Sequence, residues 1–453
     1  MIRKLRALFA DKDSLGARAI SAGLYRFGGH GAGMALRLGG NLIMTRLLAP
    51  EAFGLMAMVS AVQVAMVMFS DIGLRTAIVR SPAGDEPSFL RTAWTMQVLQ
   101  FIAVSAGVAG AGVLLWSLQG HVDFGDTVYG DPALPFLLLI STIAMMAQGM
   151  RSMNTALATR RVLQGRLTIV EVAAQAIGVG SMLCFAMIAP SVYALVFGMV
   201  ITSVAGMTMT HLVLPGPRMK PELSRDHVKE IWSFGRWLVG ASILGFFGNH
   251  GDRLVLSAFM SKEQLGLYAI AVLLVNAVQM SFARVLAPVT AALSELWRER
   301  RHDLPRGFAR VQRVYDAVSL ASAFALVLAG TTIVEILYND AFSGAGLYLS
   351  LLAFKLASVR YQPFHALLLT AGDSRRIATA TLVTSVAMLA VSITMLNTLG
   401  AHWATLFIAL NPLWTAPLLI NGVAPHVPVN RVKELAIAAL VIIAGVTWAS
   451  VMI

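Results

Sequence analysis

Residues 50–57 read Pro-Glu-Ala-Phe-Gly-Leu-Met-Ala, and residues 262–269 read Lys-Glu-Gln-Leu-Gly-Leu-Tyr-Ala. The two phrases start 212 residues apart and share Glu, Gly, Leu and Ala at equivalent positions. Each follows a hydrophobic segment that carries an arginine, Arg37 in the first and Arg253 in the second. Six apolar segments separate the two starting points, so both copies would enter a membrane from the same side. This is the pattern of a parallel repeat with its axis along the membrane normal, which is typical of transporters.

The composition of the chain indicates an integral membrane protein. Hydrophobic residues make up 57% of the 453 residues, charged residues make up 13%, and the mean hydropathy is +0.73. A soluble chain is about a quarter charged. The single cysteine, Cys184, excludes a disulfide framework and a cysteine metal site. We predict an all-α integral membrane protein of about 12–13 transmembrane helices, arranged as two six-helix bundles related by a parallel pseudo-two-fold repeat.

Apolar segments joined by short loops divide the whole chain. They cover residues 22–46, 53–79, 92–117, 133–150, 167–189, 192–213, 231–258, 265–293, 314–337, 344–370, 377–398, 402–423 and 433–453. The predicted organisation is a cytoplasmic N-terminal segment (1–21), an N-lobe of helices 1–6 (22–213), a cytoplasmic linker (214–230), a C-lobe of helices 7–12 (231–423) and an additional C-terminal helix (424–453).

Positive charge lies almost entirely on one side of this predicted topology. Twenty-five Lys and Arg residues lie in the N-terminal stretch and the even-numbered loops, against Arg46 and Lys262 on the other side. The positive-inside rule then places the N-terminus and the even-numbered loops in the cytoplasm. This asymmetry accounts for most of the net charge of +12. A nucleic-acid partner is therefore not predicted.

Eight basic residues remain inside the apolar segments: Arg26, Arg37, Arg75, Arg236, Arg253, Arg284, Lys355 and Arg360. Arg37 and Lys355 lie deepest, about 22 Å and about 16 Å into their segments at about 1.5 Å per residue. A charge at that depth costs about 3 kcal/mol or more unless it faces protein or water. We expect these two residues to line a hydrated cavity, with a buried ion pair as the alternative. For residues near a cytoplasmic end, snorkelling to the head groups is an equally good explanation.

Segment 1 supports a polar cavity. Arg26, His30 and Arg37 fall on one helical face together with Gly33, because they are spaced four, three and four residues apart. In segment 7, Asn249 lies near Arg253. A basic lining suits an anionic substrate, above all a phosphate, which arginine holds with two hydrogen bonds.

Two intramembrane acids are candidates for binding a coupling ion. Asp71 precedes Arg75 by four residues, so a local ion pair is the alternative explanation for it. Glu171 lies in segment 5, where a lone acid is either protonated or carries a coupling proton. The sequence contains no metal-ligand spacing and no nucleophile constellation, so we predict no catalytic residue, no metal and no cofactor.

The sequence also resembles a known family. Residues 45–55 read Thr-Arg-Leu-Leu-Ala-Pro-Glu-Ala-Phe-Gly-Leu, and residues 69–74 read Phe-Ser-Asp-Ile-Gly-Leu. Together they resemble the opening of the polysaccharide repeat-unit flippases, the Wzx-type members of the MOP superfamily, near the colanic-acid exporter branch. Asp-Arg-Leu-Val-Leu at 252–256 and Leu-Gly-Leu-Tyr at 265–268 resemble that family's junction between helices 7 and 8.

The resemblance implies two six-helix bundles around a central cavity that opens alternately inward and outward. The implied substrate is an undecaprenyl-diphosphate-linked oligosaccharide whose lipid stays in the bilayer. A polysaccharide polymerase or export machinery is the expected protein partner. By this analogy the cavity role falls on Arg26, Arg37, Arg75, Arg253 and Arg284. The residues themselves add Lys355, Arg360, His30 and Asn249 to this set of substrate contacts.

Three other functions remain open at this point. A peptidoglycan lipid-precursor flippase would use the same kind of basic cavity. A cation-coupled drug antiporter of the same superfamily would need a cavity with more acids than bases. A membrane glycosyltransferase or polymer ligase would need catalytic residues on a sizeable outer loop. The longest outer loop, residues 118–132, offers little beyond three aspartates.

Overall fold

The structure is a computed structural model that describes residues 15–161 and 163–453. The described residues form helices and short connections, with one isolated β-bridge between Thr127 and Ser261. Nine described helical stretches are long and apolar enough to cross a membrane, and a tenth is counted when α6 and α7, bent by 50° at their break, are taken as one. The prediction of an all-α membrane protein is confirmed.

Each of the thirteen predicted segments coincides with one helix or with a group of helices separated by short breaks. The lower count of nine or ten spans has a physical reason. Segment 1 carries charged residues and many glycines and is too polar to be counted as a span. Segments 7 and 10 are interrupted near 250 and over 354–361, which leaves pieces too short or too polar to span as single helices. The interruptions are where charged side chains gather.

The described chain falls into two compact units. Among the described residues, unit 1 comprises 15–48, 62–124, 130–161 and 163–242, and unit 2 comprises 49–61, 125–129 and 243–453. The boundaries of these units differ from those of the predicted lobes. Residues 49–61 and 125–129 group with unit 2. Residues 214–242, which are the predicted linker and the start of the predicted C-lobe, group with unit 1.

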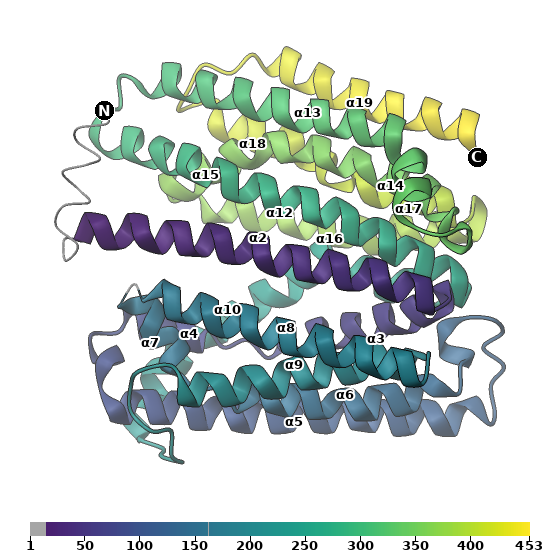
Figure 1. Cartoon of the computed structure of the whole chain (residues 1–453). Helices are drawn as coiled ribbons and strands as arrows, with labels where there is room; N and C mark the ends of the chain where they lie inside the picture. Colours follow the sequence, from purple (N-terminus) through teal and green to yellow (C-terminus); the bar gives the residue numbers. More distant parts are fainter. Residues whose placement is uncertain (1–14, 162) are drawn as a thin grey trace. The chain divides into compact units, whose positions relative to one another are not determined.

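Unit 1 is a bundle of long helices (Figure 1). It contains α2 (Leu15–Leu47), α4 (Leu74–Arg80), α5 (Pro87–Gln119), α6 (Ala133–Gly149), α7 (Asn154–Arg160), α8 (Gln164–Ile188), α9 (Val192–Leu212) and most of α10 (Arg225–Asn249). The most extensive contacts join α8 to α9, α5 to α6 and α2 to α8. At one end, α4, α5 and α7 close over a core that includes Ile78, Phe89 and Leu157.

The second predicted span, 53–79, is broken between α3 (Pro50–Phe69) and α4. The Asp71 Oδ1 accepts a hydrogen bond of 2.8 Å from the backbone N–H of Gly73. Gly73 has a φ of 66°, a left-handed conformation that glycine adopts without the steric cost of a Cβ. Asp71 and Gly73 therefore end one helix and start the next.

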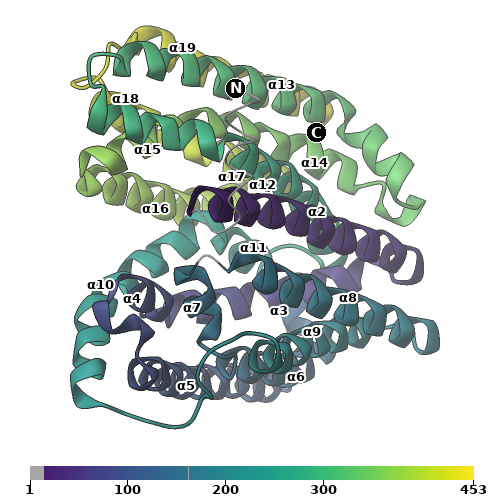
Figure 2. The same ribbon diagram turned by 60° about the vertical axis from the view of Figure 1, so that its left-hand side comes forward.

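Unit 2 contains the first turns of α3 and every helix after α10. These are α11 (Gly251–Leu256), α12 (Lys262–Glu299), α13 (Leu304–Leu337), α14 (Ala345–Ala353), α15 (Gln362–Ala371), α16 (Ser374–Thr398), α17 (Ala401–Leu410), α18 (Ala416–Val423) and α19 (Arg431–Met452). Ser261 and Gln264 form a capping box that starts α12. The last helix, α19, packs on α17 and α18 (Figures 1 and 2).

Two 3₁₀ segments interrupt the helices of unit 2. These are η4 (Phe354–Tyr361), between α14 and α15, and η5 (Asn411–Thr415), between α17 and α18. A 3₁₀ run of more than about four residues is uncommon and often marks a functional hinge. Pro363 lies in the first turn of α15, directly after η4, and Pro412 lies in the first turn of η5. Neither proline has a backbone N–H to donate. The eight residues of η4 carry both Lys355 and Arg360.

Candidate functional site

A break in predicted span 7 holds the first group of charged residues. Helix α10 ends at Asn249 and α11 begins at Gly251, with His250 between them. Asp252, in the first turn of α11, is 7% exposed and accepts a hydrogen bond from the hydroxyl of Tyr268 on α12. Tyr268 is fully buried. The carboxylate of Asp252 is therefore held in one orientation by a second helix.

Lys355 of η4 belongs to the same group. It is half-buried, and the charges of Asp252 and Arg253 both act on it. The side chain of His250 is influenced in turn by Arg253, Asp252 and Lys355. We call His250, Asp252, Arg253 and Lys355 the C-lobe cluster. It brings two predicted substrate contacts together, although they lie about a hundred residues apart in the sequence.

The C-lobe cluster carries more positive than negative charge. Arg253 and Lys355 are its two cations, and Asp252 is its one carboxylate. Charged side chains within spans face a cavity or one another, and broken helices form the ion and substrate sites of many transporters. The cluster therefore suits an anionic group.

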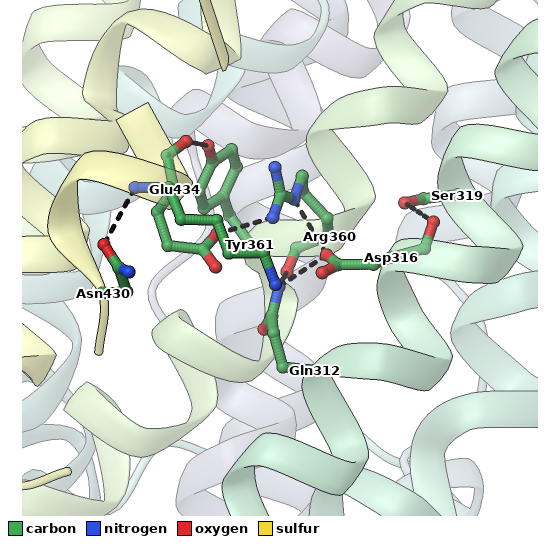
Figure 3. Close-up of polar contacts among 8 residues, drawn as sticks. Gln312, Asp316, Ser319, Arg360, Tyr361, Asn430 and Glu434 are labelled. Carbon is green, nitrogen blue, oxygen red and sulfur yellow. Dashed lines mark hydrogen bonds and ion pairs between the residues drawn. The ribbon is translucent and has the colours of Figure 1, made fainter. Parts of the chain in front are cut away.

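Arg360 lies five residues beyond Lys355 in a different environment (Figure 3). It is completely buried, and its Nε donates to Asp316 of α13 at 2.9 Å while its Nη2 donates to Glu434 of α19 at 2.5 Å. Gln312 donates to Asp316 at 2.8 Å and to the backbone carbonyl of Arg360 at 3.1 Å. Two carboxylates neutralise this guanidinium, so we do not include it among the proposed substrate contacts.

Unit 1 brings Arg75 and Glu171 to one cavity of about 230 Å³, together with Arg151. Arg75 lies on α4 and Glu171 on α8. Among the described residues, the ion pair expected as an alternative between Asp71 and Arg75 is not formed. The reason is the helix break at 70–73, which gives Asp71 a backbone partner instead.

The other predicted contacts are distributed over both units. Arg37 is exposed and His30 is half-buried, both on α2. Asn249 is exposed and donates to the carbonyl of Gly245 at 2.9 Å, and Arg284 is exposed on α12. The side chain of Arg26 lies outside the described residues. The roles of these residues in substrate binding stay predictions.

Sequence reasoning missed three charged residues that the structure makes prominent. The sequence predicts Arg151 as a loop charge, but it lies at the break between α6 and α7 and lines a cavity. Asp316 and Glu434 were not singled out, yet they hold Arg360. Among the described residues, no group of three His, Cys, Asp or Glu side chains could hold a metal ion.

The fold is similar to those of solved transporter structures. The lipid II flippase MurJ in an inward closed conformation has a TM-score of 0.72 at 11% identity, over 95% of this chain and 97% of that chain. An inward-facing multidrug resistance MATE family transporter of the MOP superfamily has a TM-score of 0.59 at 12% identity, over 92% and 95%. A MOP superfamily transporter from Pyrococcus furiosus has a TM-score of 0.51 at 13% identity, over 96% of each chain.

The spans and this likeness define a multi-pass membrane protein with the fold of the MOP-superfamily transporters. A family model described as "Polysaccharide biosynthesis protein" matches residues 43–346. The chain belongs to this family. No curated protein matches the chain by sequence. The resemblance seen in the sequence is confirmed at the level of the superfamily, and the colanic-acid branch stays a prediction.

Proposed function

We propose that the protein is a flippase that moves an undecaprenyl-diphosphate-linked oligosaccharide from the inner to the outer leaflet of the bacterial cytoplasmic membrane. It works by alternating access and supplies polysaccharide export, with its N-terminus in the cytoplasm. The observation that carries this proposal is the C-lobe cluster. Arg253 and Lys355 lie at two helix breaks in a chain of the polysaccharide biosynthesis family.

The physical problem of such a substrate is its headgroup. A diphosphate and several sugars cannot cross about 30 Å of hydrocarbon without a polar path. Guanidinium and ammonium groups form charge-assisted hydrogen bonds with phosphate oxygens, which are roughly twice as strong as neutral ones. Arg37, Arg253 and Lys355 would supply such bonds, while Asp71 and Glu171 stay candidates for the groups that couple transport to an ion.

A second candidate is a flippase for a peptidoglycan lipid precursor. The likeness in fold to the lipid II flippase MurJ favours it, and a basic cluster suits that diphosphate equally well. A drug antiporter is disfavoured, because the excess positive charge of the C-lobe cluster would repel a cationic drug. The lipid that accumulates in a deletion strain would distinguish the two flippases.

The test is to delete the gene and extract the undecaprenyl-diphosphate lipids from the deletion strain. Accumulation of a complete repeat unit that only a cytoplasmic reagent can label supports the proposal and identifies the glycan. Accumulation of the peptidoglycan precursor on that face supports the second candidate. A repeat unit that reaches the outer face at the normal level but stays unpolymerised would contradict transport and indicate an enzyme that acts afterwards.

A further inference from the structure

Four helices of unit 1 enclose the cavity that Arg75 and Glu171 share. It has a volume of about 230 Å³ and lies between α4, α7, α8 and α9. Its polar lining consists of Arg75, Arg151, Thr155, Thr159, Glu171 and Thr210. We call it the N-lobe pocket. In the predicted orientation it lies toward the cytoplasmic ends of these helices.

The backbone around Arg151 is fixed by neighbouring helices. The side-chain amide of Gln97 on α5 donates to the carbonyls of Gly149 at 2.7 Å and Arg151 at 3.1 Å. The backbone N–H of Ser152 donates to the hydroxyl of Thr210 on α9 at 3.2 Å. Carbonyl and N–H groups that the break between α6 and α7 leaves without helical partners are thereby satisfied. The backbone from which the Arg151 side chain extends is therefore held in place by α5 and α9.

The guanidinium of Arg151 lies directly against α9 at Gly206. A Cβ at position 206 would stand 2.1 Å from Nη2 and 3.0 Å from Cζ of Arg151, so only glycine leaves room for the side chain in this place. The Nε of Arg151 is buried and has no hydrogen-bond partner. Among the described residues, no carboxylate lies within 4.0 Å of the charged nitrogens of Arg75 or Arg151.

The charges in the N-lobe pocket do not balance. Arg75 and Glu171 both act electrostatically on Arg151, which gives two guanidinium groups and one carboxylate in one small space. A buried charge is costly when its partners are missing. An anion that entered the pocket would balance the second cation.

The other polar groups make the pocket selective for hydrogen-bond acceptors. Each threonine hydroxyl donates to a carbonyl of its own helix or turn, at 3.0 Å for Thr155, 3.1 Å for Thr159 and 2.6 Å for Thr210. The donors left for a ligand are therefore the two guanidinium groups. Their planar pairs of N–H groups match the oxygens of a phosphate.

We propose that the N-lobe pocket binds a diphosphate group, held by Arg75 and Arg151, and that Glu171 competes for the same guanidinium groups and so promotes release. The volume is below the roughly 300–1,000 Å³ of pockets for drug-sized ligands, so it admits the diphosphate and not the glycan. That the diphosphate belongs to a lipid-linked glycan rests on the proposed function. The binding site itself does not.

The test measures binding of inorganic diphosphate to the purified full-length protein. Arg151→Ala is expected to weaken binding about tenfold or more, because it removes charge-assisted hydrogen bonds. Gly206→Ala is expected to weaken it in the same direction, since the new methyl group displaces the guanidinium. Glu171→Gln is expected to tighten binding. Arg166→Ala, which removes an exposed arginine of α8 outside the pocket, is the control with the same change of net charge and is expected to bind normally.

Three further results separate the possibilities. Competition by undecaprenyl diphosphate would assign the ligand to a lipid, whereas competition only by free phosphate compounds would assign it to a soluble source. Displacement by phosphatidylglycerol vesicles as effective as that by diphosphate would overturn the diphosphate assignment. Equal affinity of the wild type, Arg151→Ala and Gly206→Ala, each with an unchanged melting temperature, would overturn the site.

The failure of this site and of the proposed function can be told apart. If the variants lose diphosphate binding while the wild type moves no lipid-linked glycan, the pocket stands and the proposed function fails. If the wild type moves the glycan and Arg151→Ala moves it equally well with unchanged diphosphate binding, the pocket fails alone.

Discussion

Gly54 and Gly266, the equivalent glycines of the two related phrases, lie against each other in unit 2. A Cβ on Gly54 would stand 2.2 Å from the carbonyl oxygen of Lys262 and 3.2 Å from the N atom of Gly266. A Cβ on Gly266 would stand 1.9 Å from the carbonyl oxygen of Pro50 and 3.2 Å from the N atom of Gly54. Each glycine thus meets the residue four positions before the other. The parallel repeat of the two halves stays a prediction, and it would account for this reciprocity.

This contact predicts that Gly266→Ala destabilises the protein. The methyl group would overlap a backbone carbonyl, which cannot move away as a side chain can, so we expect a cost of about 1–3 kcal/mol. The melting temperature of the purified protein measures the effect. Gly39→Ala is the control, because nothing lies within 4 Å of a Cβ at position 39. Equal melting temperatures for Gly266→Ala and the wild type would rule out the close contact.

The buried ion network in Figure 3 predicts a large effect at Glu434. Glu434→Ala leaves the completely buried Arg360 with Asp316 as its remaining carboxylate partner, and breaking a buried pair typically costs about 3–5 kcal/mol. We expect a lower melting temperature and loosening of α19. Glu335→Ala, at an exposed position of α13, is the matched control and should have little effect. If both variants melt like the wild type, the network does not hold α19.

Arg37 and Lys355 are the two basic residues that lie deepest in their predicted spans, and their substitution should remove function while the protein still folds. We expect Arg37→Ala and Lys355→Ala to abolish polysaccharide export while the proteins accumulate at the wild-type level. The reason is that each side chain would contact the diphosphate or sugars during transport. Export is measured in a deletion strain complemented by each variant, with protein abundance measured in the same cells. Normal export by both variants would indicate that these residues have a structural role and do not contact the substrate.

A contact between the segment 214–230 and the start of α5, outside the membrane, is expected to depend on pH. Glu222 accepts hydrogen bonds from the Ser88 hydroxyl at 2.5 Å and from Arg91 at 3.3 Å, and these bonds, that of Ser88 first, lower the pKa of Glu222. A lowered pKa means that the contact is stabilising above the ordinary value of about 4.3 and is lost as the pH falls through the lower, folded-state value.

A dye on Lys220→Cys, in a Cys184→Ser background, reports on this contact. Its anisotropy should be high at neutral pH and fall in acid. Glu222→Gln should remove the pH response, because the amide does not titrate. A response of the same size in Glu222→Gln would assign the transition to another group.

The fold could be predicted from the sequence to a large extent, because apolar length and the distribution of positive charge directly reflect the bilayer. Every predicted segment corresponds to helix. The breaks were harder to predict. Asp71 and Gly73 end a helix inside an apolar stretch, and the 3₁₀ run of η4 packs against α13 and lies just before Pro363.

The candidate sites were predicted only as single residues. Lys355 is predicted from its depth and Arg253 from the resemblance to the flippase family, whereas the environment that they share depends on how α11 and η4 pack. Arg151 looked like one of many cytoplasmic loop charges, since the groups that give it its place, Gln97 and Gly206, lie on α5 and α9. The spacing of residues along the sequence does not indicate contacts between helices that are distant in the sequence.

The central claim is that the protein moves a lipid-linked glycan across a bilayer. The most direct measurement uses liposomes that contain the purified protein and a fluorescent undecaprenyl-diphosphate oligosaccharide. A quencher that cannot cross the membrane is added outside. If the protein is a flippase, the inner-leaflet glycolipid becomes accessible to the quencher in liposomes with the wild-type protein, and remains protected with Lys355→Ala and without protein. Equal protection in all three preparations, under an imposed proton gradient, sodium gradient or membrane potential, would contradict it.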